Sequence, residues 1–292
     1  MSNSSENTLL CNSYFRIFFS LVGYMGRSGD TGDIFSFSPD GKSYERIRCG
    51  SDVACSPDGN WIAFVAREDK TDNDGIWVMR PNGKSAMPIA YHNDATASAP
   101  TWAPNSNEIA YQYYNYEKQE YRICIVNPSN GQIRAITESG YTNPQWLSTN
   151  EILFEKEFDY EVFIANHNGI RKSEFLSNFI EEHFSYTFSH DASQIAGVKN
   201  TRTICIVNSD GSNYREFDFP NFHIAYVRWA PDDRCLIFSV QRSAEQWVQE
   251  LWAISVDGTH KWLVFKSRQT GVFDDDLRLI SSFSGSPPSE IY

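Results

Sequence analysis

The sequence lacks the local signatures of several large enzyme and binding classes. It contains no CxxC pair, no Walker loop and no dinucleotide-binding glycine motif, so zinc-ribbon, P-loop and Rossmann chemistry have no support. No apolar run reaches the roughly 18–20 residues that a membrane-spanning helix needs. Basic residues are scarce, because 25 Lys and Arg stand against 37 Asp and Glu for a net charge of −12. This balance disfavours a protein that binds nucleic acid along its whole fold.

Cysteine is also sparse, with six residues in a chain of 292, which is too few for a disulfide scaffold. Cys124 and Cys205 lie in matching Ile/Val segments, 122–127 and 203–208, and this context predicts buried free thiols. The apolar stretch 17–25 has little positive charge before it and no small-residue cleavage site after it, unlike a signal peptide. We therefore expect a cytoplasmic protein with no membrane span.

Apolar and aromatic residues, by contrast, are plentiful. The hydrophobic fraction is 41%, and 15% of the chain is Phe, Tyr or Trp. This amount can fill a core and suits a β-rich interior, so wholesale disorder is excluded.

A hairpin pattern recurs about every 43 residues. Short β-branched or aromatic strands end in Asp-Gly, Asn-Gly or similar turns, as in segments 75–84 and 203–211. The turn glycines recur at intervals of 42, 48, 38, 42 and 47 residues, at Gly41, Gly83, Gly131, Gly169, Gly211 and Gly258. Such turns between apolar strands are the strongest local indication of a β-hairpin.

A second pattern interleaves with the first. An aromatic residue or Cys precedes a Pro/Asp turn and an apolar strand, as in segments 55–64, 102–111 and 229–238. Each unit therefore contains four short strands, which bury both faces only when units stack radially. This predicts an all-β fold, a six-bladed β-propeller of four-stranded antiparallel blades.

We expect a single propeller domain over residues 1–292. The predicted blades span approximately 8–47, 53–89, 99–136, 143–176, 184–217 and 226–265, and 266–292 would hold a ring-closing strand and a tail. The first repeat has no Pro/Asp turn of its own. Its missing inner strand is either 277–283 or, alternatively, 8–11.

These motifs resemble the TolB-like, PD40 (WD40-like) propeller repeat, whose pattern is roughly W-S-P-D-G-x-x-I-A-F followed by I-W-V-x-x-x-D-G. The resemblance covers about residues 15–265, is closest over 53–89, and departs from the pattern at Leu147 to Asn150. It implies a TolB-like propeller. Because TolB is periplasmic, the resemblance makes the periplasm the alternative to the cytoplasm.

One face of such a propeller is predicted to bind. The Pro/Asp/Gly turns share one face, whereas the inter-blade loops and the loops between second and third strands share the other. The second face is rich in amphipathic aromatic residues, which interfaces use as anchors. The candidate binding residues are Tyr91, His92, Tyr114, Tyr116, Tyr160, His183, Phe184, Phe222, His223 and Tyr226. The alternative is that these side chains only cap the blade ends.

Catalytic and metal sites find less support. Three candidate ligands, His92, His183 and His223, lie in inter-blade loops that approach the channel. The resemblance extends to oligogalacturonate lyases, which use histidines and a divalent metal, but no motif here specifies ligand positions. The segment 26–30 fails the G-x-S-x-G pattern of a hydrolase nucleophile. We predict no catalytic residue and no cofactor.

The resulting interpretation is a non-enzymatic scaffold for a protein or peptide partner. The net charge of −12 favours a basic partner. Two alternatives stay open. One is a metal-assisted enzyme acting on a small or saccharide substrate at the channel mouth, and the other is the propeller portion of a prolyl-oligopeptidase-type peptidase or sensor.

Overall fold

The structure is a computed structural model, and every sheet it describes is four-stranded and antiparallel. The described residues are 16–21, 33–37, 44–67, 73–159, 161–166, 169–173, 176, 178–179, 182–183, 185–189, 191, 193–230, 233–241, 249–266 and 277–284. Among them, no helix has the length and apolar character needed to cross a membrane. The predicted all-β propeller with four-stranded blades is confirmed.

Five blades are each folded from one continuous stretch of chain. The first has β4 (Ser51–Cys55), β5 (Ile62–Arg67), β6 (Asp74–Met79) and β7 (Met87–Ala90). The second has β8 (Ala95–Trp102), β9 (Ile109–Asn115), β10 (Glu120–Val126) and β11 (Ile133–Ala135). The third has β12 (Tyr141–Trp146), β13 (Ile152–Lys156), β14 (Val162–Asn166) and β15 (Gly169–Lys172).

The other two continuous blades follow the same order. The fourth has β16 (Ser185–Phe188), β17 (Gln194–Lys199), β18 (Thr203–Asn208) and β19 (Arg215–Asp218). The fifth has β20 (His223–Trp229), β21 (Cys235–Gln241), β22 (Gln249–Ser255) and β23 (Lys261–Lys266). In all five, neighbouring strands in the sheet are neighbours in the chain.

The predicted count of six blades, each formed by one repeat, is wrong. Five blades arise in that way, whereas residues 8–47 do not make a complete blade. β1 (Arg16–Leu21), β2 (Asp33–Phe37) and β3 (Tyr44–Cys49) form a sheet with β24 (Leu277–Ser284), in the order β24-β1-β2-β3. The physical reason is the missing first turn: without it, β1 takes its inner neighbour from the other end of the chain. The alternative inner strand, residues 8–11, lies outside the described residues.

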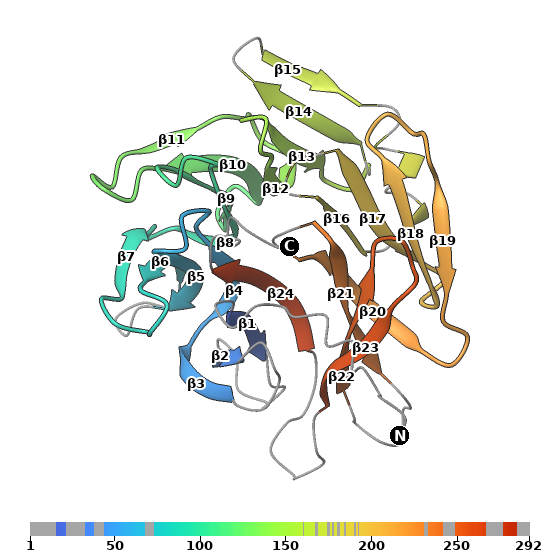
Figure 1. Ribbon diagram of the computed structural model, residues 1–292. Coiled ribbons are helices and arrows are strands. Elements are labelled where there is room, and N and C mark those ends of the chain that lie inside the picture. The colour runs from blue at the N-terminus through green and yellow to red at the C-terminus, as the bar shows by residue number, and fades with distance from the viewer. Residues whose placement is uncertain are drawn as a thin grey trace, which may run out of the picture.

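The first strands of the continuous blades lie around the centre of the ring, and β24 lies among them (Figure 1). β24 contacts β4 on one side and β20 on the other. Pairing of β24 with β1 therefore joins strands from the two ends of the chain, and it covers the inner edge of β1.

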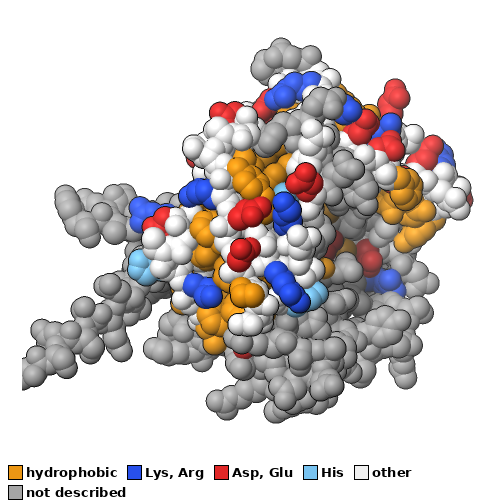
Figure 2. Space-filling view, turned by 90° about the vertical axis from the view of Figure 1, so that its right-hand side faces the viewer, with side chains coloured by type: hydrophobic (Ala, Val, Ile, Leu, Met, Phe, Trp, Pro, Cys, Tyr) orange, Lys and Arg blue, Asp and Glu red, His pale blue; other side chains and the backbone are white. Residues whose placement is uncertain are grey.

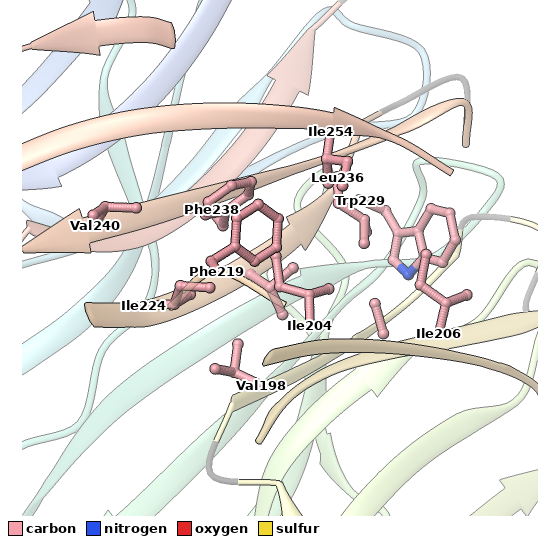
Figure 3. Close-up of a cluster of buried hydrophobic side chains, with 12 residues drawn as sticks. Val198, Ile204, Ile206, Phe219, Ile224, Trp229, Leu236, Phe238, Val240 and Ile254 are labelled. Atoms are coloured by element: carbon pink, nitrogen blue, oxygen red, sulfur yellow. The ribbon is translucent and has the colours of Figure 1, made fainter. Parts of the chain in front are cut away.

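The core lies between blades. In Figure 3, Val198, Ile204 and Ile206 of the fourth blade meet Leu236 and Phe238 of the fifth. A similar cluster lies between the first two blades, around the fully buried Ile76 and Tyr111. Because each blade buries its faces only against its neighbours, the blades stabilise one another.

The repeated tryptophan has a defined role at these interfaces. The indole N–H of Trp102 donates to the Ala54 carbonyl of the preceding blade at 3.0 Å. Trp229 makes the equivalent bond to the Thr187 carbonyl at 3.1 Å. Both rings are buried, so in these two blades the tryptophan joins its Pro/Asp turn to the inner strand of the preceding blade, whereas the indole of Trp146 donates to Asn150 in its own turn.

Bulges recur on the inner strands. Asp52, Ala99 and Asn143 have φ values of 46°, 49° and 52°, and the strand register shifts at each of them. The Ala99 amide donates to Asp52 Oδ2 at 3.1 Å, and the Asn143 amide donates to Gln112 Oε1 at 3.0 Å. A residue in the left-handed conformation recurs at the same place in three consecutive blades, so the bulge is a regular part of the repeat and not a local irregularity.

The buried thiols lead to a first prediction. Cys124 and Cys205 are buried and free, as predicted, and burial raises the pKa of each to about 11. Cys49 is exposed instead, with the Arg46 guanidinium 3.0 Å from its sulfur. Since the thiolate is the reactive form, we expect Ellman's reagent at pH 8 to label Cys49 rapidly in the native protein. Cys49→Ser should remove one equivalent from the fast phase and Cys205→Ser should remove none, and loss of fast signal in Cys205→Ser would contradict the burial.

Candidate aromatic binding face

The loops between blades and the loops between second and third strands lie at the same end of the sheets. In the described residues this end comprises 91–94, 116–119, 136–140, 157–159, 200–202 and 219–222. We call it the loop face. The Pro/Asp/Gly turns lie at the opposite end, because the strands of every blade alternate in direction.

Three tyrosines gather on the loop face of the second blade. Tyr114 and Tyr121 are cross-strand partners of β9 and β10, with ring centroids 4.4 Å apart. Tyr116 stands edge-on to Tyr114 at 5.5 Å, and 51% of its surface is exposed. Burial and then the nearby Glu157 carboxylate raise the pKa of Tyr121. We call Tyr114, Tyr116 and Tyr121 the tyrosine cluster.

Phe158 extends this aromatic surface into the third blade. The Gly140 amide donates to the Tyr121 carbonyl at 2.8 Å, and the Glu157 amide donates to the Gly140 carbonyl at 2.9 Å. This chain of backbone bonds ties the loop carrying Phe158 to the tyrosine cluster. Phe158 is 88% exposed and has φ 65°, a left-handed conformation that is costly for a bulky residue. Packing does not account for such a placement.

His92 caps a blade rather than presenting a free ring. Its Nε2 lies 3.0 Å from the hydroxyl of the buried Tyr111, and Tyr113 stands edge-on to it at 4.7 Å. Burial lowers the pKa of His92, although Asp94 opposes this. The neighbouring Tyr91 is half-buried against Gly75.

His183 is 2% exposed and also belongs to the interior. Its Nδ1 lies 2.6 Å from the Phe179 carbonyl oxygen, and its ring stacks on Phe179 at 4.0 Å. A Cβ at Gly197 would come within 2.8 Å of this ring, so only glycine leaves room for it. Burial is the main reason that the pKa of His183 is lowered.

The remaining candidates are spread around the ring. Phe222 is half-buried and stacks on Phe219 at 5.7 Å, whereas His223 is exposed at the start of β20. Tyr226 is half-buried on the same strand. Tyr160 and Phe184 lie outside the described residues. Across the described part of the chain, no group of three or more His, Cys, Asp and Glu side chains could hold a metal ion, so the structure does not gather His92, His183 and His223 into one.

Sequence reasoning missed a buried carboxyl group on β13. Glu155 is 9% exposed and accepts hydrogen bonds from Asn143 and from the hydroxyl of Tyr186 on the adjacent blade. Burial raises the pKa of Glu155 to about 7, against the opposing effect of Asn143. Arg228 of β20 donates to the Tyr186 carbonyl at 3.3 Å.

Glu155 can be found in the sequence by aligning the repeats with one another. It follows Ile-Leu-Phe, at the place that other blades fill with Val65, Gln112, Val198 or Ser239. An acid at a position otherwise occupied by apolar or neutral residues is the residue that burial perturbs most.

Comparisons with known proteins support the fold. TolB from Acinetobacter baumannii superposes with a TM-score of 0.69 at 14% identity, over 94% of this chain and 67% of that one. A chain of the nidogen/laminin complex gives 0.59 at 9% identity, over 92% and 98% of the two chains. An oligogalacturonate lyase in complex with manganese gives 0.55 at 11% identity, over 79% and 70%. No family model and no curated protein sequence matches the chain. The fold is therefore a TolB-like β-propeller.

Proposed function

We propose that this chain is a PD40-type propeller that acts as a non-enzymatic binding scaffold, with the loop face binding a protein or peptide partner. The observation that carries the proposal is the exposure of two aromatic side chains, Tyr116 of the tyrosine cluster at 51% and Phe158 of the neighbouring loop at 88%. Large, rigid aromatic rings that are exposed and fixed by backbone bonds are typical anchors of protein interfaces.

The charge of the chain favours a basic partner. A net charge of −12 attracts basic polypeptides and repels acidic polymers over about a Debye length. The structurally similar nidogen/laminin chain comes from the structure of a protein complex, and this is consistent with the proposal. We expect a partner with basic residues flanking an apolar or aromatic anchor.

A peptide-display experiment tests the proposal. A random 12-residue library is selected on the immobilised protein, and the dissociation constants of enriched peptides are then measured for variants. We expect enrichment of Lys, Arg and aromatic residues. Tyr116→Ser with Phe158→Ser should weaken binding by at least about tenfold, as expected for two interface anchors.

Tyr214→Ser provides the matched control, because Tyr214 is 46% exposed but lies in the β18–β19 turn on the opposite face. The affinity of the Tyr214→Ser variant for the selected peptides should equal that of the unmodified chain. Tyr114→Ala and His223→Ala extend the series across the loop face. Unchanged affinity in the Tyr116 and Phe158 double variant, or equal loss in Tyr214→Ser, would reject the loop face as the binding surface.

A further inference from the structure

Three aromatic rings surround one ammonium group at the outer part of the interface between the fourth and fifth blades. Phe219 and Phe222 come from the β19–β20 loop, and Trp252 comes from β22. The Phe222 ring centroid lies 5.7 Å from that of Phe219 and 5.1 Å from that of Trp252. The Lys261 Nζ lies 4.9, 5.1 and 5.8 Å from the centroids of Phe219, Phe222 and Trp252, respectively. We call the three rings the aromatic cage.

The cage has the chemistry of a cation site. Each distance lies within the roughly 6 Å over which a ring face attracts a cation. The Trp252 indole N–H donates to Oε2 of the buried Glu250 at 2.7 Å, which fixes the ring and places an acidic group behind it. Phe219 is 4% exposed and packs on Phe238, so the rear wall is rigid. Figure 3 shows Phe219 and Phe238 side by side in this core.

Among the described residues, the side-chain contacts of the Lys261 ammonium are those with the three rings. Lys261 is exposed at the start of β23, and within the described residues no ion pair joins it to an acidic side chain. Its flexible four-carbon stem lets the ammonium leave the rings without a change in the backbone. Figure 2 shows the edge of the molecule that lies on the right in Figure 1, where exposed hydrophobic side chains are interspersed with basic and acidic ones.

We propose that the aromatic cage is a binding site for a quaternary ammonium group, and that Lys261 occupies and closes it in the free protein. A primary ammonium such as that of Lys261 is strongly hydrated and loses hydrogen bonds to water among three rings. A trimethylated ammonium has no N–H groups to satisfy, and its methyl surface matches ring faces. It therefore competes for the cage with Lys261. This site is separate from the tyrosine cluster and does not depend on the function proposed for it.

The test uses tetramethylammonium as the first probe, followed by calorimetric titration. Lys261→Ala should bind tetramethylammonium about tenfold more tightly than the unmodified chain does. This gain is expected because the variant has no competing ammonium group among the rings. In the Lys261→Ala background, Phe222→Leu keeps an apolar side chain in place but should weaken tetramethylammonium binding by at least about tenfold. Phe222→Tyr, which keeps an aromatic ring, should leave that affinity unchanged. Lys84→Ala, at an exposed turn lysine, should leave the affinity unchanged.

Two further ligands distinguish the source of the ammonium group. N-acetyl trimethyllysine amide represents a methylated polypeptide, and phosphocholine represents a lipid headgroup or a free metabolite. Tighter binding of either one supports the site and identifies its source. Two results would overturn the proposal: no tighter binding of tetramethylammonium by Lys261→Ala, or unchanged binding when Phe222→Leu is added. Circular dichroism spectra that match the unmodified chain establish that each variant is folded.

Discussion

Trp229→Ala is expected to lower the free energy of unfolding by about 3–5 kcal/mol, the range for removing a large aromatic side chain from a core. Trp229 is 3% exposed and packs in the cluster between the fourth and fifth blades. The substitution leaves a cavity there and removes the hydrogen bond to the Thr187 carbonyl. Urea unfolding followed by circular dichroism measures the loss. Trp229→Phe should cost less, since its ring refills part of the cavity, although the hydrogen bond to the Thr187 carbonyl is still lost.

Trp61 is the matched control for this prediction. It is half-buried, and its ring is covered by the Arg80 guanidinium at 3.8 Å on the turn face. Its loss removes one partly exposed cation–π contact and the packing of a half-buried ring at the edge of the cluster between the first two blades, so Trp61→Ala should cost about 1 kcal/mol. Equal losses at Trp61 and Trp229 would mean that the inter-blade cluster does not dominate the stability of the ring.

The strands could be predicted from the sequence because their turns carry local signals. Gly83 and Gly211, for example, have φ values of 78° and 86°, and they end the hairpins β6–β7 and β18–β19 where Asn-Gly and Asp-Gly were found. The turn type depends on two or three neighbouring residues, so a single sequence contains the information.

The closure of the ring was predicted only as a choice between two inner strands, of which 277–283 is confirmed by the pairing of β24 with β1. Pairing of Arg16–Leu21 with Leu277–Ser284 joins segments about 260 residues apart, and no local pattern specifies which distant strand completes a sheet. The sequence left two candidate inner strands for the first repeat. Counting each repeat as a complete blade therefore counted one blade too many.

The candidate site, too, could be predicted only in part. Loop position follows from strand order, so the aromatic residues of the loop face could be placed on one end of the propeller. The exposure of each side chain and the residues that it contacts could not be predicted, because they depend on packing between blades. His183 was predicted on a binding surface, yet its ring is buried between Phe179 and Gly197. Phe222 stays a predicted binding residue, and the structure shows that its half-buried ring packs beside Trp252 and Lys261.

Glu155→Gln is expected to stabilise the protein at pH 8 by up to about 3 kcal/mol and to have little effect at pH 4. The ordinary pKa of the Glu155 carboxyl is 4.5, and burial raises it to about 7 in the folded chain. Between these two pH values the unfolded chain ionises this carboxyl while the folded chain keeps it protonated. Glu155 therefore reduces stability as pH rises through this window, and the full loss is present above pH 7.

Glutamine keeps the shape of the side chain and an oxygen that accepts from Tyr186 and Asn143, but it cannot ionise. Urea unfolding at pH 4, 5.5, 7 and 8 measures the free energy of unfolding of Glu155→Gln and of the unmodified chain. The effects of other titrating groups cancel in the difference between the two.

Glu151, in the turn before β13, supplies a control of opposite sign. Burial there is outweighed by hydrogen bonds from Asn166 and Thr149 and by Arg171, which lower the pKa of Glu151. Its charge stabilises the fold above its unfolded pKa, so Glu151→Gln should be less stable than the unmodified chain at pH 8. If Glu155→Gln and Glu151→Gln shift stability in the same direction at pH 8, burial at the interface between the third and fourth blades does not raise the pKa of Glu155.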